Sequence, residues 1–148
     1  QYARVVVRLI VAMALGACLG WEREMSGKSA GLRTHMLVAL GVALILVATQ
    51  QSGMPQADLS RVVQGIFAGI GFVGAAAIIK PQQDDRVHGV TTAASIWATA
   101  AIAGAAGLGR MGPAVIGTLF AVVILAWLRR VERKAALKAQ ADPAQPPK

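Results

Sequence analysis

The stretch VVQGIFAGIGFVGAAAII, residues 62–79, decides the fold of this chain. It holds no charged residue, and its apolar positions do not recur with the 3.6-residue period of a soluble amphipathic helix. A helix that is apolar all round lies either in a buried core or in lipid. We therefore predict that residues 62–79 form a transmembrane helix.

Four further apolar stretches accompany it, separated by short polar connections: residues 5–21, 35–50, 90–108 and 113–128. At about 1.5 Å per residue, the five stretches are roughly 24–28 Å long, slightly shorter than a hydrocarbon core of ~30 Å. Snorkelling side chains or local thinning of the bilayer close such a gap. The prediction is an all-α, polytopic bundle of five spans within residues 1–128, and four spans with a re-entrant segment are the alternative.

The composition agrees with a membrane protein. The 148 residues are 55% hydrophobic with a mean hydropathy of +0.56, above the ~45–50% apolar content of a soluble domain. The first stretch is not expected to be a signal peptide, because charged residues follow Trp21 without a small-residue cleavage site. The single cysteine, Cys18, has no partner in the chain and implies no disulfide.

Basic residues are distributed unevenly between the two ends of such a bundle. With five spans, four fall at the end that carries the amino terminus and eleven at the other end. Basic residues near span ends are retained in the cytoplasm, so the amino terminus is expected outside and the carboxyl terminus inside. Because these charges flank spans and form no contiguous face, nucleic acid is not an expected partner.

The tail after the last span is basic. Residues 129–138 are predicted to extend the helix, and residues 139–148, with three prolines, are predicted to be disordered. Most such tails are only solvated. The alternative is that the first basic residues hold anionic lipid head groups: Arg129, Arg130, Arg133 and Lys134.

Small residues predict close packing between helices. The third stretch carries four glycines followed by alanines, and a helix with so little side chain is expected in the middle of the bundle. Alternatively, its GIG segment is a flexible break that exposes backbone carbonyls to a polar cavity. The packing or hinge candidates are Gly16 and Gly20 in the first stretch and Gly65, Gly69, Gly71 and Gly74 in the third; Gly117 and Ala121 form a further small pair.

No pattern indicates an enzyme or a cofactor. The letters GxGxxG at positions 69–74 match a dinucleotide fingerprint, but this motif needs a preceding strand and a βαβ unit, and here it lies inside an apolar span. His35 and His88 lack metal-ligand spacing, and no serine or cysteine nucleophile has a recognisable base. We expect a non-enzymatic protein without a cofactor, and the sequence leaves a metal undecided.

Polar residues gather at the connections between spans. Glu22 ends the first span and Arg33 begins the second, so they are expected to pair at the membrane boundary, with Thr34 as a capping residue. Asp58 lies in a first helical turn, where the helix dipole favours an acid, three residues before Arg61. Thr91 and Thr92 begin the fourth span and are either caps or functional residues.

Three ordered blocks resemble the signatures of the MgtC/SapB (YhiD) membrane domain: ERE…KSAGLRTH at 22–35, DxxRxxQ…GIGFVGA at 58–75, and HGVTTAASIW at 88–97. The resemblance covers roughly residues 5–128. It implies that the functional candidates are Glu22, Arg23, Lys28, Arg33, Thr34 and His35 in the first block, Asp58, Arg61 and Gln64 in the second, and Thr91, Thr92 and Trp97 in the third.

The resemblance implies a protein of the bacterial inner membrane that is linked to growth at low magnesium, acid tolerance and survival in host cells. Some members bind other membrane proteins, so a partner such as the proton-translocating ATP synthase is an expectation here. Two departures matter. Ala76 stands where a glycine is frequent, and the soluble carboxyl-terminal domain of longer members is absent from this sequence, so functions of that domain are not implied.

Two classes of function remain open. One is a non-enzymatic regulator that binds membrane components, and the other is an ion or solute transporter whose pathway the third span lines. The five stretches hold no acidic residue, and Arg8 lies near enough to the outer end to snorkel, which favours the first class. The exposed small-residue faces also predict a homo-oligomer in the bilayer, most simply a two-fold dimer.

Overall fold

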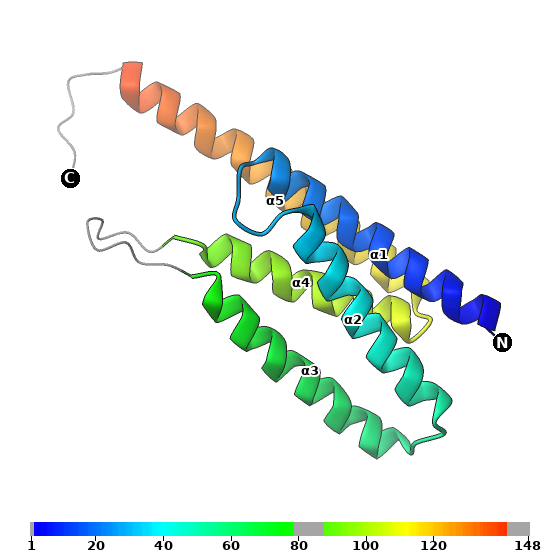
Figure 1. Ribbon diagram of the computed structural model, residues 1–148. Coiled ribbons are helices and arrows are strands. Elements are labelled where there is room, and N and C mark those ends of the chain that lie inside the picture. Colours follow the sequence, from blue (N-terminus) through cyan, green and yellow to red (C-terminus); the bar gives the residue numbers. More distant parts are fainter. Residues whose placement is uncertain (1, 79–87, 142–148) are drawn as a thin grey trace.

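The computed structural model describes residues 2–78 and 88–141 and shows a bundle of helices (Figure 1). Within these residues all five helices are long and apolar enough to cross a membrane, which confirms the all-α, polytopic prediction. They are α1 Tyr2–Met25, α2 Leu32–Gln51, α3 Gln56–Ala76, α4 Val90–Gly107 and α5 Met111–Ala141.

The helices run back and forth between two ends of the molecule. The start of α1, the α2–α3 connection and the α4–α5 connection lie at one end, which we call the amino-terminal end (Figure 1). The α1–α2 loop, the start of α4 and the extension of α5 lie at the opposite end. We call this the motif end, because it carries residues 22–35.

The helix boundaries differ from the apolar stretches where polar residues flank a span. α1 extends about one turn beyond residues 5–21 on both sides, and α3 begins at Gln56, ahead of the predicted 62. Backbone hydrogen bonding continues through such flanks, because water or head groups can solvate their side chains. α5 continues through the basic residues to Ala141, further than the predicted 138, and the rest of the predicted disordered tail lies outside the described residues.

The centre of the bundle is α4, and not the third span as its glycines predict. Ten of the 18 residues of α4 are buried, and this helix contacts each of the other four. In α3 only Ile70 and Gly74 are buried. The reason is that α4 carries alanine, glycine, serine and threonine on most of its circumference, whereas α3 also carries bulky side chains such as Phe72 that face outward.

Two glycines allow α1 and α2 to touch through their backbones. A Cβ atom on Gly16 would lie 2.7 Å from the Cβ of Ala39 and 2.8 Å from the carbonyl oxygen of His35. A Cβ on Gly20 would lie 2.8 Å from the Cα of Leu32. These distances leave no room for a side chain, so the two glycines set the separation of the helices. The same kind of contact brings Gly107 of α4 within reach of α2.

Arg8 joins three helices at the amino-terminal end. Its Nη1 donates to Oε1 of Gln50 on α2 at 2.5 Å and to the carbonyl oxygen of Gly107, the last residue of α4, at 3.2 Å. The carbonyls at a helix end lack partners within the helix, and a cation there is favoured by the helix dipole. Gly109, with φ of +78°, ends the turn under this guanidinium. Arg8 therefore reaches across helix ends, and does not only snorkel outward as its position predicts.

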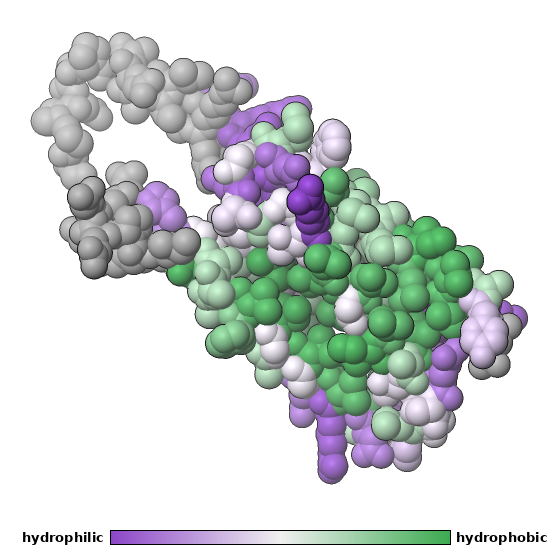
Figure 2. Space-filling view, in the orientation of Figure 1, coloured by the Kyte–Doolittle hydropathy of each residue, from purple (hydrophilic) through white to green (hydrophobic). Residues whose placement is uncertain are grey.

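The outer surface of the bundle is apolar between its two ends. Figure 2 shows a band of hydrophobic side chains across the middle of one face, with hydrophilic residues at both ends. Exposed hydrophobic residues occur on each of the five helices, for example Val6, Leu37, Phe72, Trp97 and Leu119. A surface with this pattern faces the hydrocarbon of a bilayer.

The helix contact predicts opposite effects for two glycine substitutions. Gly16→Ala should destabilise the bundle by about 1–3 kcal/mol, because overpacking forces the helices apart. Gly41→Ala on α2, where a Cβ would meet no atom within 4 Å, should be neutral or stabilising by about 0.5–1 kcal/mol, because alanine favours the helix. Thermal unfolding in mild detergent, followed by circular dichroism, measures both. Equal effects of the two substitutions would contradict the proposed role of Gly16.

Candidate functional site

A buried histidine connects α2 to α4 at the motif end. His35 lies in the first turns of α2 and is 0% exposed. Its Nδ1 lies 2.9 Å from the carbonyl oxygen of Gly31, and its Nε2 lies 3.1 Å from Oγ of Ser95 on α4. Both ring nitrogens therefore have partners, which a buried imidazole requires.

The hydroxyl of Ser95 has one proton and two hydrogen-bonding neighbours. Its Oγ lies 2.8 Å from the carbonyl oxygen of Thr92 and 3.1 Å from Nε2 of His35. Because the carbonyl of Gly31 only accepts, Nδ1 of His35 carries a proton. A neutral ring then accepts the Ser95 proton at Nε2, whereas a doubly protonated ring donates to Ser95 and leaves that proton to Thr92. The orientation of the hydroxyl is thus coupled to the protonation of His35.

Arg23 brings a positive charge to the same place. It lies in the last turn of α1 and is 4% exposed. Its positive charge is close enough to the ring of His35 for an electrostatic interaction. Its Nη1 lies 3.4 Å from Oε2 of Glu22, while its buried Nε has no hydrogen-bond partner in the described chain. A buried guanidinium N–H without an acceptor is costly. Arg23, His35, Thr92 and Ser95 together form what we call the polar cluster.

Glu22 holds the edge of the polar cluster and connects it to α5. Its Oε1 accepts a hydrogen bond from Oγ of Ser26 at 2.7 Å and lies 3.7 Å from Nη1 of Arg129. Arg129 also donates to Oγ of Ser26. The predicted pair of Glu22 and Arg33 is therefore wrong. Arg33 is the second residue of α2 and is exposed, and no hydrogen bond or ion pair joins it to the described chain.

The cap of α2 also differs from the prediction. The helix begins at Leu32, two residues before Thr34, and its N-cap is Gly31 without a side-chain cap bond. A residue of α1 provides the acceptor that the N-cap lacks: Oε2 of Glu24 accepts a hydrogen bond from the backbone N–H of Leu32 at 2.7 Å. A Cβ on Gly31 would lie 2.7 Å from this oxygen. A glycine at this position therefore allows Glu24 to cap the helix.

The structure brings together part of the predicted set of residues. Four of the twelve candidates meet at the motif end in or beside the polar cluster: Glu22, Arg23, His35 and Thr92. Four others lie at the same end, in the α1–α2 loop and the first turns of α2 and α4, with exposed or half-buried side chains: Lys28, Arg33, Thr34 and Thr91. The rest lie on other surfaces of the bundle: Asp58, Arg61 and Gln64 near the start of α3, and Trp97 on the outward side of α4 against the ring of Phe67.

Sequence reasoning missed the contributions of Ser26, Ser95 and Arg129 to this site. Ser95 lies within an apolar stretch, where a lone serine gives no signal, although its spacing of three from Thr92 places both on one face of the helix. Ser26 and Arg129 meet across a sequence separation of 103 residues, which no local pattern encodes. In the described residues no group of three or more His, Cys, Asp or Glu side chains is arranged to hold a metal ion.

The fold and this site define a class of protein: a multi-pass helical membrane protein with a buried arginine–histidine–hydroxyl cluster near one end of the bundle. The model of the MgtC family matches residues 9–134, most of the chain. The chain therefore belongs to the MgtC family.

Three relatives illustrate the family. Protein SrpB of Synechococcus elongatus is 42% identical over 142 residues, covering 88% of this chain and 78% of its own. The putative magnesium transporter YhiD of Escherichia coli K12 is 35% identical, covering 83% of this chain and 60% of its own. Protein MgtC of Brucella abortus is 39% identical, covering 80% of this chain and 48% of its own. The chain thus spans about half to three quarters of these relatives, and no solved structure matches it.

The cluster predicts that one hydroxyl matters more than its neighbour. Ser95→Ala should destabilise the protein by about 1–3 kcal/mol, because it leaves Nε2 of the buried His35 without a partner. Thr91→Ala, on the exposed side of the same helix, should change stability by less than about 0.5 kcal/mol. Thermal unfolding in mild detergent provides the measurement. A Ser95→Ala protein as stable as the wild type would show that this hydrogen bond contributes little.

Proposed function

We propose that this chain is a non-enzymatic protein of the bacterial inner membrane that binds other membrane components during adaptation to low magnesium or acid stress. The distribution of basic residues favours an amino terminus outside and a carboxyl terminus, with the motif end, in the cytoplasm. By family resemblance, the proton-translocating ATP synthase is a candidate partner. A second copy of the chain is another.

The observation that carries this proposal is the uncovered face of α3. A Cβ placed on Gly65, Gly69 or Gly71 would meet no atom of the chain within 4 Å, and Phe72 is 80% exposed. Within lipid, helices associate through small residues that let backbones approach closely. The glycines of α1 and α4 make such contacts inside this chain, and Gly74 of α3 packs against α4, whereas Gly65 and Gly69, which share one face of α3, are left for another helix. A homo-oligomer, most simply a two-fold dimer, uses this face.

An oligomer formed through α3 predicts the effect of added bulk. Gly69→Leu should convert the assembly to monomers without unfolding the bundle, because the added side chain blocks backbone approach on a face that no intrachain helix covers. Leu119→Ala, on the exposed side of α5, is the control and should leave the assembly intact. Light scattering in mild detergent and in nanodiscs measures the mass. A wild-type monomer under both conditions would exclude the dimer.

Arg33 is the exposed residue of the first family block that we expect to contact a ligand or partner. It has no hydrogen bond or ion pair to the described chain, and it follows the α1–α2 loop, whose Ser26 donates a hydrogen bond to Glu22. Arg33→Ala should therefore abolish growth at low magnesium in a bacterial strain that depends on this chain, while the protein still inserts. Arg130→Ala, which removes an exposed arginine from α5 at the same end, should support growth. Growth of the Arg33→Ala strain at the wild-type rate would mean that the loop is only a solvated connection.

Transport is the second candidate function, and a line of hydroxyls supports it. Thr92, Ser95 and Thr99 are buried along one side of the central helix α4, and polar residues inside a membrane bundle frequently mark ion pathways. Gly65, Gly69 and Gly71 of α3 face outward. This argues against a transport pathway that α3 lines within a single chain. Flux of Mg²⁺ into liposomes that contain the protein distinguishes the two functions, since a protein that only binds partners produces none.

A further inference from the structure

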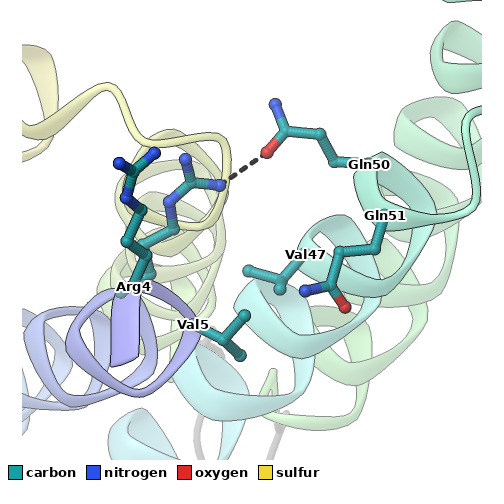
Figure 3. A pocket seen from close by; sticks show the side chains of 6 residues that line it. Arg4, Val5, Val47, Gln50 and Gln51 are labelled. Atoms are coloured by element: carbon teal, nitrogen blue, oxygen red, sulfur yellow. Dashed lines mark hydrogen bonds between the residues drawn. The ribbon is translucent and has the colours of Figure 1, made fainter. Parts of the chain in front are cut away.

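Two arginines at the amino-terminal end, Arg4 and Arg8, line two clefts. The first cleft, of about 280 Å³, lies between α1 and α2 and is lined by Arg4, Val5, Arg8, Val47, Gln50 and Gln51. Figure 3 shows Arg4 and Gln50 on opposite sides of it, with the hydrogen bond from Arg8 to Gln50 drawn as a dashed line. The second cleft, of about 310 Å³, borders the start of α5 and is lined by Ala3, Arg4, Val7, Arg8, Gly109 and Met111.

The charge of this arginine pair is not compensated within the described chain. Arg4 and Arg8 are four residues apart on α1, so their side chains are neighbours on one face of the helix, where like charges repel. The carboxylate–guanidinium pairs of the described residues lie at the motif end and involve Glu22. Gln50 and Gln51, which line the opposite wall, are neutral. An anion from outside the chain would therefore lower the energy of this site.

Hydrogen-bond donors remain free to hold such an anion. Arg8 uses its Nη1 for Gln50 and the carbonyl of Gly107, which leaves its Nε and Nη2 available. Arg4 makes no hydrogen bond to the described chain and offers all five of its N–H groups. Arginine forks match the oxygens of a phosphate group in pairs, and such charge-assisted bonds are about twice as strong as neutral ones.

We propose that the two arginines bind the phosphate group of an acidic phospholipid. The site lies in the first turns of α1, at the amino-terminal end of the bundle, which is the level of the lipid head groups and their phosphates when the helices span a bilayer. The remaining walls of both clefts are largely apolar, with Val5 and Val47 in one and Val7 and Met111 in the other. These walls suit the glycerol and the first methylene groups of a lipid better than they suit a free, fully hydrated phosphate ion.

Lipid titration of the full chain tests the proposal. Native mass spectrometry of the protein in mild detergent measures binding of phosphatidylglycerol and of phosphatidylcholine. The wild type should bind phosphatidylglycerol about tenfold more tightly than phosphatidylcholine, and Arg4→Gln should reduce that preference by about tenfold, because it removes a charge-assisted contact. Arg4 is the variant of choice, since Arg8 also holds the end of α4. Arg61→Gln, on exposed α3 at the same end and outside both clefts, should keep the preference.

The outcomes separate this site from general attraction and from soluble phosphate. Equal binding of the two lipids by the wild type, or equal losses in Arg4→Gln and Arg61→Gln, would overturn the proposal. Millimolar inorganic phosphate is added as a competitor in a further titration. Retention of phosphatidylglycerol in its presence supports a lipid site, whereas displacement in the wild type would mean that the arginines take soluble phosphate and the lipid assignment is wrong.

Discussion

Gly16 and Gly20 let the backbone of α1 lie directly against α2, with no side chain between the two helices. Within lipid there is no hydrophobic force that drives helices together, so van der Waals contact and interhelical hydrogen bonds hold the bundle. This contact also fixes where α2 begins relative to the end of α1. A Cβ on Gly20 would lie 3.0 Å from the Cβ of His35. The absence of a side chain at Gly20 therefore also allows His35 to lie this close to α1.

The polar cluster depends on that placement. His35 reaches Ser95 only because α2 holds it against α4, and Arg23 is buried at the same end of the bundle. Burying such groups is unfavourable unless they are paired, and a fully paired network defines how the helices align. The exception within the described residues is Nε of Arg23, which is buried without a hydrogen-bond partner. In this respect the polar cluster differs from a fully paired structural core.

Helices α1, α2 and α4 form the core of the bundle, and the two ends of the bundle and the outer helix α3 differ in the groups that they expose. The motif end encloses charge that is partly compensated by Glu22 and exposes Arg33 beside it. The amino-terminal end carries arginines that have no carboxylate partner in the described chain. Helix α3 packs mainly on α4 and exposes Gly65, Gly69 and Gly71 to the bilayer. A three-helix core that presents a separate outer helix fits the proposed role of binding other membrane components.

The sequence by itself determined the membrane class and the family blocks and favoured five helices over four, because long apolar stretches and ordered motifs are local properties that no later packing can reverse. It placed Glu22, Arg23 and His35 near one another for the same reason. Only the tertiary structure decided that α4 lies at the centre and α3 outside, because glycines allow close contact without stating which helix provides it. It also decided that Glu22 meets Arg129, that Ser95 meets His35, and that Arg33 has no partner among the described residues. Those outcomes depend on the rotation of each helix about its axis, which is fixed by contacts between residues far apart in the chain.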